Sequence, residues 1–309
     1  MRAIFFGTPE IAVPALHALS EVAEIVAVVS QPDRPAGRGL QLASPPVKQA
    51  ALALGLPVHQ PKAVKTGALA TWVHEHTVDV ALVMAYGRIL PIDVLSAPRA
   101  GSLNLHASLL PKYRGAAPIQ WSIIEGEQET GISLMLMDEG MDTGPVYHRA
   151  AIPIRPNEDA GQLAERLSLL AADVTRQQVP RAVRGELAPV PQDAALASYA
   201  PPIDAARRKV DWTQSAAAIA CLVRGLSPRP SAITTARGKH LKLLEVLATD
   251  ATTHLAPGEV SLEDAGLCVG TGQGAVAVLR AQVEGKRPMS GRDLVNGRFV
   301  KPGDRLGSQ

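Results

Sequence analysis

The sequence has few aromatic residues and no long hydrophobic run, and each shortage excludes a class of protein. Aromatic side chains make up 3% of the 309 residues, whereas 46% of the chain is hydrophobic. A core built mainly from Ala, Leu and Val suits helices packed on a parallel sheet better than an aromatic-rich sandwich. No apolar run is long enough to cross a bilayer, and the first strand-like segment is too short for a signal peptide. We therefore expect a soluble, cytoplasmic protein with no membrane partner.

Cysteine and glycine patterns exclude two further classes. Cys221 and Cys268 stand alone, without a CxxC pair or histidines at ligand spacing. This argues against a disulfide framework and a metal site, so we expect two small core residues. The turn at 7–10 (GTPE) lacks the three glycines of a dinucleotide fingerprint, and no acidic residue closes the second strand. We therefore reject NAD binding.

Length and periodicity predict two domains. Strand-like and helix-like segments alternate in the first part, which predicts an α/β, Rossmann-like domain with a mainly parallel sheet at 1–184. A Pro- and Ala-rich stretch at 185–204 has the composition of a linker. Five short strand-like segments follow, separated by glycines, and they predict a smaller, mostly β domain at 205–309, of the OB-like barrel type.

The expected elements are as follows. Strands are predicted at 2–6, 24–30, 56–59, 78–85, 102–107, 131–137, 146–154, 232–236, 240–247, 258–262, 266–269 and 274–281. Helices are predicted at 9–22, 45–54, 67–76, 117–125, 161–178, 211–224 and 290–296, with a short one beginning at the turn 86–91.

Charge is unevenly distributed along the chain. The net charge is only +2. From Asp204 onward there are 15 Lys and Arg against 10 Asp and Glu, net +5, which leaves 16 against 19, net −3, before it. The second domain is therefore the basic one, which permits a polyanionic partner.

The stretch 101–121 (GSLNLHASLLPKYRGAAPIQW) is the strongest functional signal. Asn104 and His106 lie two residues apart at the end of a predicted strand, hence on the same face. An amide donor beside an imidazole can hold an oxygen on which negative charge develops. The alternative is structural: Asn104 caps the strand and His106 is a buried histidine with satisfied hydrogen bonds.

Three loops surround this stretch. The loop 31–46 carries Arg34 and Arg38 and is longer than a strand-to-helix connection needs; the alternative is a surface excursion with two solvated arginines. The turn 86–91 follows a neighbouring strand and is expected to form a pocket wall. The glycine-punctuated turn 138–145 has Asp142 at its centre.

These motifs together resemble those of the folate-dependent formyltransferases. The pattern is Asn-x-His at 104–106, SLLPKYRGAAP at 108–118 and MDTG at 141–144. Within that superfamily, QPDRPAGRG at 31–39, AYGRILP at 85–91 and the basic second domain are similar to the members that formylate methionyl-tRNA. The resemblance covers essentially the whole chain and is strongest through residue 155.

The resemblance implies a reaction and its site. The enzyme would transfer the formyl group of 10-formyltetrahydrofolate to the α-amine of initiator methionyl-tRNA, for translation initiation, as a monomer and without a metal. Asn104, His106 and Asp142 would be the catalytic residues. The implied folate-binding residues are Tyr86, Gly87, Ile89, Leu90, Ser108, Leu109, Leu110, Pro111 and Met137. The implied tRNA-binding residues are Arg34, Arg38, Arg207, Arg208 and Lys209.

Two departures from the family pattern bear on tRNA contacts. Pro202 and Ala205 stand where the family carries lysines, and PRP at 228–230 stands where it carries Pro-Trp-Pro. Two rival functions remain: a formyltransferase acting on an amino sugar nucleotide, expected to lack the 31–46 insertion, and a nucleic-acid-binding protein with an inactive enzyme domain.

Overall fold

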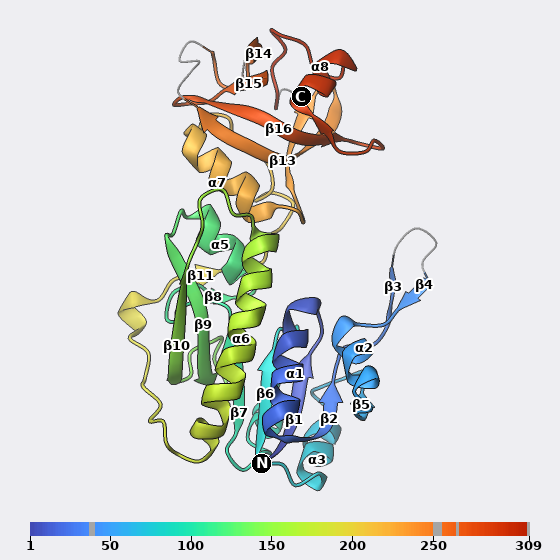
Figure 1. Cartoon of the computed structure of the whole chain (residues 1–309), viewed down its shortest axis with the longest axis vertical. Coiled ribbons are helices and arrows are strands. Elements are labelled where there is room, and N and C mark those ends of the chain that lie inside the picture. Colours follow the sequence, from blue (N-terminus) through green and yellow to red (C-terminus); the bar gives the residue numbers. More distant parts are fainter. Residues whose placement is uncertain (37–40, 250–254, 264–265, 308–309) are drawn as a thin grey trace. The chain divides into compact units, whose positions relative to one another are not determined.

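A computed structural model of the chain describes residues 1–36, 41–249, 255–263 and 266–307, and it divides into two compact units (Figure 1). We call them unit 1 and unit 2. Unit 1 comprises Met1–Pro118, Thr130–Ile152 and Ala164–Ala200, and unit 2 comprises Ile119–Glu129, Pro153–Leu163 and Pro201–Gln309.

Unit 1 is organised around a seven-stranded sheet in the order β10-β9-β7-β6-β1-β2-β5. β1 pairs in parallel with β2 and β6, β2 with β5, and β6 with β7, whereas β7 and β9 are antiparallel. This confirms the predicted mainly parallel α/β sheet. The strands are β1 (Arg2–Gly7), β2 (Glu24–Val29), β5 (Val58–His59), β6 (Val80–Met84), β7 (Ser102–His106), β9 (Glu129–Leu136) and β10 (Val146–Pro153).

Helices cover this sheet, and two of them are tied to each other. Arg176 on α6 donates to both carboxylate oxygens of Glu21 on α1, at 2.5 and 3.0 Å, and Figure 1 shows the two helices side by side. The helices of unit 1 are α1 (Val13–Val22), α2 (Pro46–Ala53), α3 (Ala68–Glu75), α4 (Ile92–Leu95) and most of α6 (Ala160–Val183), whereas α5 (Pro118–Ile124) belongs almost entirely to unit 2. None of the described helices has both the length and the apolar character needed to cross a membrane.

Three predicted helix boundaries in this part of the chain were wrong. The first helix was expected from Pro9, but a 3-10 turn, η1 (Glu10–Ala12), precedes it. The helix expected to end at 178 continues to Val183 because Val179 and Ala182 extend its buried stripe. The short helix expected from the turn 86–91 begins only after it, at α4.

The insertion 31–46, expected as a loop, contains a short antiparallel ribbon. β3 (Arg34–Ala36) pairs with β4 (Gln41–Ala43). Asp33, at the base of the ribbon, accepts hydrogen bonds from Gln60 (2.8 Å), Lys48 (2.8 and 2.9 Å) and Ser44 (3.2 Å). The hydrogen bonds from Gln60 and Lys48 hold the pKa of the Asp33 carboxyl below its usual value.

Unit 2 contains an antiparallel sheet in the order β12-β13-β16-β15-β14, with β17 paired to β16. This confirms the predicted mostly β second domain, whose strands pair in the antiparallel direction. Trp212, Ile219, Leu243 and Leu294 belong to its apolar core. The elements are α7 (Ala216–Leu226), β12 (Ala232–Ala236), β13 (Lys239–Thr249), β14 (Val260–Glu263), β15 (Gly266–Gly270), β16 (Ala275–Val283), β17 (Met289–Ser290) and α8 (Gly291–Asn296).

Two local predictions for unit 2 need correction. The helix expected from Asp211 begins at Ala216, because the Asp211 carboxylate closes a turn on the Thr213 backbone (3.0 Å) and Ser215 provides the cap. Of the two expected core cysteines, Cys268 is fully buried, whereas Cys221 is only partly buried on α7.

Candidate active site

Strand β7 places two polar side chains in the interior of unit 1. It lies between β6, where Val83 is opposite Asn104, and β9, where Ser133 is opposite His106. Asn104 is 9% exposed and His106 is 6% exposed. Both side chains leave the same face of the strand because they are two residues apart.

The imidazole of His106 is hydrogen-bonded at one nitrogen and faces a carboxylate with the other. Nε2 lies 2.9 Å from the carbonyl oxygen of Tyr113. A carbonyl oxygen can only accept, so Nε2 carries the proton of this hydrogen bond. Nδ1 lies 3.6 Å from Oδ2 of Asp142. The second ring nitrogen therefore faces the Asp142 carboxylate.

Asp142 reaches His106 from the turn after β9. Its Oδ2 also accepts a hydrogen bond from the backbone N–H of Gly115, at 2.8 Å. Its backbone has φ 55°, a left-handed conformation that non-glycine residues seldom adopt. The Asp142 side chain is 18% exposed, so its carboxylate is partly accessible. The structure thus brings together His106 and Asp142, which are distant in sequence.

The turn around Asp142 is fixed by its own hydrogen bonds and by close packing. Asp138 accepts from the Thr143 hydroxyl (2.8 Å) and from the Gly140 backbone (3.1 Å). A Cβ on Gly144 would lie 1.8 Å from the carbonyl oxygen of Leu136, so this position admits only glycine. The conformation of the turn therefore depends on its sequence.

Ser133, which the sequence analysis did not single out, anchors the loop after β7. Its hydroxyl donates to the carbonyl of Ser108 (2.7 Å) and accepts from the backbone N–H of Leu110 (3.0 Å). The Ser108 hydroxyl in turn donates to the carbonyl of Lys112, at 2.6 Å. Ser133 could have been found only from the pairing of β9 with β7, which places it opposite His106. The sequence does not show how these strands pair.

The residues expected to bind folate differ in how far they are buried. Tyr86 packs edge-on against Phe6, with ring centroids 5.5 Å apart, and burial raises the pKa of its hydroxyl. Leu110 packs in a small cluster with Met135 and Val146. Ile89, by contrast, is 81% exposed. Tyr86, Leu90, Ser108 and Leu110 are buried, Leu109, Pro111 and Met137 are partly buried, and Gly87 and Ile89 are exposed.

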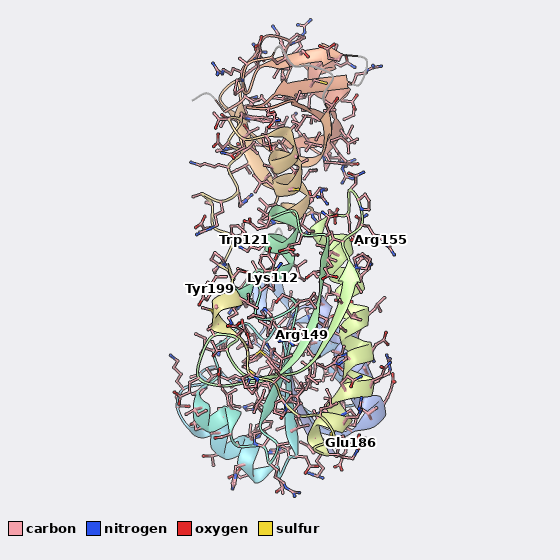
Figure 2. All side chains as sticks on the ribbon, turned by 90° about the vertical axis from the view of Figure 1, so that its left-hand side faces the viewer. Lys112, Trp121, Arg149, Arg155, Glu186 and Tyr199 are labelled. Atoms are coloured by element: carbon pink, nitrogen blue, oxygen red, sulfur yellow. The ribbon has the colours of Figure 1, made fainter. Side chains whose placement is uncertain are left out.

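Residues 190–200, predicted to be part of a linker, run along the loop that follows β7; we call them the crossing segment. β11 (Tyr199–Ala200) pairs in parallel with β8 (Arg114–Gly115). The backbone N–H of Arg114 donates to the Ser198 carbonyl (2.9 Å), and that of Ala116 to the Ala200 carbonyl (2.9 Å). In Figure 2, the labelled Tyr199 and Lys112 mark the segment and the loop. The pairing is too short to leave a periodic pattern in the sequence.

The two arginines of the insertion, Arg34 and Arg38, differ in what the structure describes of them. Arg34 is exposed, and its guanidinium donates to the side-chain oxygen of Gln31 at 2.7 Å. Arg38 lies outside the described residues. The amide of Gln31 donates to the carbonyl of Tyr86 (2.8 Å), so the base of the insertion is hydrogen-bonded to the turn 86–91.

The three cationic side chains of unit 2 that are expected to contact tRNA differ in their exposure and in their partners. Arg207 is exposed and forms an ion pair with Asp204. Arg208 is partly buried. Its guanidinium donates to the carbonyls of Ser231 (3.0 Å) and Pro230 (2.7 Å), so this side chain has a structural role. Lys209 is exposed.

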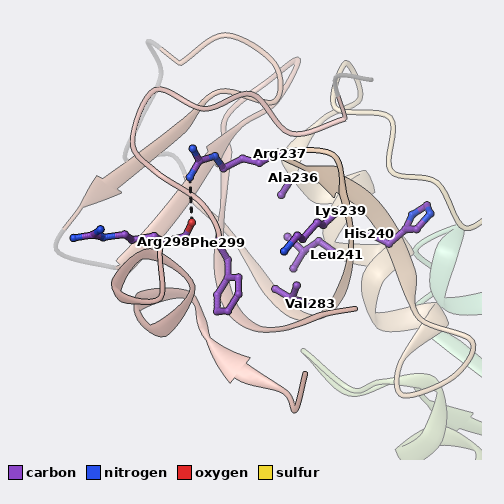
Figure 3. Close-up of a pocket in the computed structure, with 8 residues that line it drawn as sticks. All are labelled: Ala236, Arg237, Lys239, His240, Leu241, Val283, Arg298 and Phe299. Atoms are coloured by element: carbon purple, nitrogen blue, oxygen red, sulfur yellow. Dashed lines mark hydrogen bonds between the residues drawn. The ribbon is translucent and has the colours of Figure 1, made fainter. Parts of the chain in front are cut away.

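Two of the hollows in the described part of unit 2 are lined by basic side chains. One, of about 280 Å³, is shown in Figure 3, where the Arg237 guanidinium donates to the carbonyl of Arg298 at 3.1 Å. The other has a volume of about 850 Å³. The cations lining the larger hollow are Arg208, Arg224, Arg229, Lys242 and Arg280. Cationic side chains around concave surfaces favour anionic partners. Within the described part of the chain, no group of His, Cys, Asp and Glu is arranged to hold a metal ion.

Comparison with known sequences gives matches along the whole chain. A family model described as formyl transferase matches residues 1–179, and one described as formyl transferase, C-terminal domain, matches residues 202–298. The protein named methionyl-tRNA formyltransferase from Sorangium cellulosum is 53% identical over 310 residues, covering 99% of this chain and 100% of that protein. The protein of the same name from Geobacter metallireducens is 45% identical and covers 98% of each chain.

Solved structures share the fold at lower identity. An N-formyltransferase from Helicobacter canadensis, in complex with folinic acid and dTDP-3-aminofucose, has a TM-score of 0.68 at 18% identity, covering 89% of this chain and 97% of that chain. HypX from Aquifex aeolicus has a TM-score of 0.67 at 19% identity. That match covers 98% of this chain but 48% of HypX, so the chain spans about half the length of that protein.

Proposed function

The chain belongs to the formyl transferase family, and from that membership we infer that it transfers a formyl group to the α-amino group of methionyl-tRNA, the reaction that prepares the initiator for translation. The observation that carries this function is the 53% identity to a methionyl-tRNA formyltransferase over the full length of both chains. The full-length match includes the basic second domain as well as the site on β7. We further propose initiator methionyl-tRNA as the acceptor, the cytoplasm as the location and a monomer as the active form.

We propose 10-formyltetrahydrofolate as the formyl donor; when bound, it supplies the carbon that the amine attacks. A structure of HypX was solved in complex with tetrahydrofolic acid. Two exposed apolar side chains support a flat, partly apolar ligand here: Ile89 on the turn after β6 is 81% exposed, and Met141, next to Asp142, is 63% exposed. Parallel strands β6 and β7 end at the same edge of the sheet, so the turn after β6 lies on the side where Asn104 and His106 end β7.

Asn104 and His106 are assigned to the oxyanion. As the amine attacks the formyl carbon, the carbonyl oxygen gains negative charge, and donors fixed in advance stabilise it without reorganisation. Asn104 offers an amide N–H, and a protonated His106 offers positive charge from the same strand face. Burial of both groups strengthens this stabilisation because little water screens it.

Asp142 is assigned to His106 and to proton movement. Its carboxylate, 3.6 Å from Nδ1, favours the charged imidazole and orients the ring together with the Tyr113 carbonyl. Its 18% exposure lets it accept a proton from the attacking amine, directly or through water. A free α-amine has a pKa of about 7.7–8.0, so a neutral fraction is present near neutral pH and no activating lysine is required.

The reaction is tested by offering the purified chain two amine acceptors with 10-formyltetrahydrofolate. We expect formylation of charged initiator tRNA and none of a nucleotide-linked amino sugar. Formylation of the sugar alone would support the rival function; the likeness to a sugar-bound N-formyltransferase, at 18% identity, concerns the fold only. Binding of tRNA without transfer would support the inactive-enzyme alternative.

Arg38 is the residue whose replacement is expected to affect tRNA most selectively. Replacing Arg38 with leucine should lower kcat/KM for initiator methionyl-tRNA about 5- to 150-fold, the cost of one well-made polar contact, and leave folate affinity unchanged. A residue that reads bases should lose discrimination against elongator methionyl-tRNA, whereas a phosphate contact should weaken both tRNAs equally and reduce the salt dependence. The measurement is kcat/KM for both tRNAs at several salt concentrations.

Arg99 provides a matched control for Arg38. It is an exposed arginine of unit 1 whose side chain is 80% exposed and forms an ion pair with Asp79 at 3.3 Å. Arg99→Leu removes the same charge from a different part of the unit and should leave kcat/KM unchanged. Parental kinetics and selectivity in Arg38→Leu would mean that the insertion is only a surface excursion.

A further inference from the structure

Gln192 of the crossing segment uses its whole side-chain amide to join two parts of the site. Its Nε2 donates to the carbonyl oxygens of Asp142 (2.8 Å) and Gly144 (2.7 Å). Its Oε1 accepts from Nε (3.1 Å) and Nη2 (2.8 Å) of Arg114. A primary amide has two N–H donors and one oxygen with two lone pairs, so all of its hydrogen-bonding capacity is used.

Both parts that Gln192 joins contact the His106–Asp142 pair. On one side is the turn that carries the Asp142 carboxylate. On the other is Arg114, a 5% exposed side chain whose two chain neighbours hold the pair: Tyr113 accepts from His106, and Gly115 donates to Asp142. One amide therefore connects the two backbone segments that set where the imidazole and the carboxylate meet.

We propose that Gln192 is a positioning residue that keeps the Asp142 carboxylate in register with the His106 imidazole. It acts through Asp142 and does not itself touch the substrates. The backbone at Asp142 is left-handed, with φ 55°, and an aspartate has lower-energy alternatives. The two hydrogen bonds that Gln192 donates, to the carbonyl of Asp142 and to that of Gly144, favour the strained conformation. The proposal rests on the proposed function, which gives His106 and Asp142 their roles.

Backbone hydrogen bonds before and after Gln192 fix the crossing segment. Val190 exchanges two backbone hydrogen bonds with Val146, at 2.8 and 2.9 Å, just before Gln192. After it, Ser198 and Ala200 accept from the loop that contains Arg114. The amide is thus carried by backbone that is fixed at both ends, which a positioning group requires.

Two substitutions separate the contacts of Gln192. Gln192→Met keeps the length of the side chain and removes all four hydrogen bonds. Gln192→Glu keeps an acceptor for Arg114 and loses both donations to the Asp142 turn. We expect both variants to lower kcat about 10- to 100-fold, the scale of a small misplacement of a reacting group, with little change in the KM for either substrate. A parental kcat in Gln192→Glu would overturn the proposal, because the contact to Arg114 alone would then account for the role of Gln192.

The same substitution in an Asp142→Asn background tests whether Gln192 acts through Asp142. If it does, adding Gln192→Met to Asp142→Asn should change kcat by less than about 3-fold, because the group to be positioned has already lost its charge. The full 10- to 100-fold loss in both backgrounds would mean a general structural role and overturn the proposal. If Asp142→Asn alone has parental activity, the assigned catalytic pair is wrong, which is a failure of the proposed function and is seen in the single variant.

The neighbouring residue provides the control. Asp193 is exposed, and its carboxylate accepts only from the backbone of Ala195, at 2.9 Å, within the part of the chain that the structure describes. Asp193→Ala changes the same segment without changing the Asp142 turn, and we expect a parental kcat. Thermal unfolding of all variants establishes that each is folded at the assay temperature.

Discussion

Replacing Asn104 with alanine is expected to lower kcat about 10²- to 10³-fold while folate affinity stays near that of the parent. The reason is that the side chain removed is the proposed oxyanion donor, whose hydrogen bond would strengthen only as charge develops in the transition state. Single-turnover formylation of methionyl-tRNA measures the chemical step, and equilibrium titration with a folate measures binding. Because Asn104 is 9% exposed and lies in the middle of β7, an interior strand of the sheet, thermal unfolding of the variant is measured alongside.

Ser102, on the same strand, serves as the comparison. It is buried, and its hydroxyl donates to the carbonyl of Leu95 at 2.9 Å. Ser102→Ala therefore removes a buried hydrogen bond from β7 and should cost stability, about 1 kcal/mol, without slowing the reaction. If Asn104→Ala resembles Ser102→Ala, with stability reduced and kcat retained, Asn104 is the strand cap of the structural alternative. A loss confined to folate affinity would make it a binding residue.

Replacing Asp142 with asparagine is expected to lower kcat by about 10²-fold or more. The substitution is nearly isosteric, and the new amide oxygen can still accept from the Gly115 backbone, so the turn keeps its hydrogen bond. What is lost is the negative charge 3.6 Å from Nδ1 of His106, and with it the proposed partner of a charged imidazole and the proposed proton acceptor. The measurement is again single-turnover formylation, with folate titration to establish that binding is retained.

Asp138 lies in the same turn and provides the matched substitution. Its carboxylate holds Thr143 and Gly140, and no contact to His106 is among its hydrogen bonds in the described part of the chain. Asp138→Asn removes a charge from the turn while keeping an acceptor, and kcat should fall far less than in Asp142→Asn. Equal losses in the two variants would indicate that the turn as a whole, and not the Asp142 charge, supports the reaction.

The mainly parallel fold could be predicted because its signal, the alternation of apolar strands and helices, is local. The spacing of Asn104 and His106 indicated the end of the strand at which the candidate site lies. The choice of Asp142 depended on the resemblance, since nothing in the 35 residues between it and His106 indicates that they meet. Sequence spacing alone contains no such contact.

The partners of the catalytic pair could not be predicted, for a different physical reason. His106 is held by a backbone carbonyl of Tyr113, and Asp142 by a backbone N–H of Gly115. Backbone groups are the same in every residue, so the sequence gives no sign of which ones point at a site. Gln192 could not be predicted either, because its segment has the Pro- and Ala-rich composition typical of a linker.

The pairing of β11 with β8 bears on how this enzyme can be divided. The two family models match residues 1–179 and 202–298, so a fragment designed on the first would end before the crossing segment. Such a fragment would leave the backbone N–H groups of Arg114 and Ala116 without their acceptors and would lack Gln192. A chimera that exchanges the basic domain would have the same defect unless its junction lay after Ala200. A fragment meant to retain the complete site would therefore have to extend to Ala200, beyond the last residue that the first family model matches.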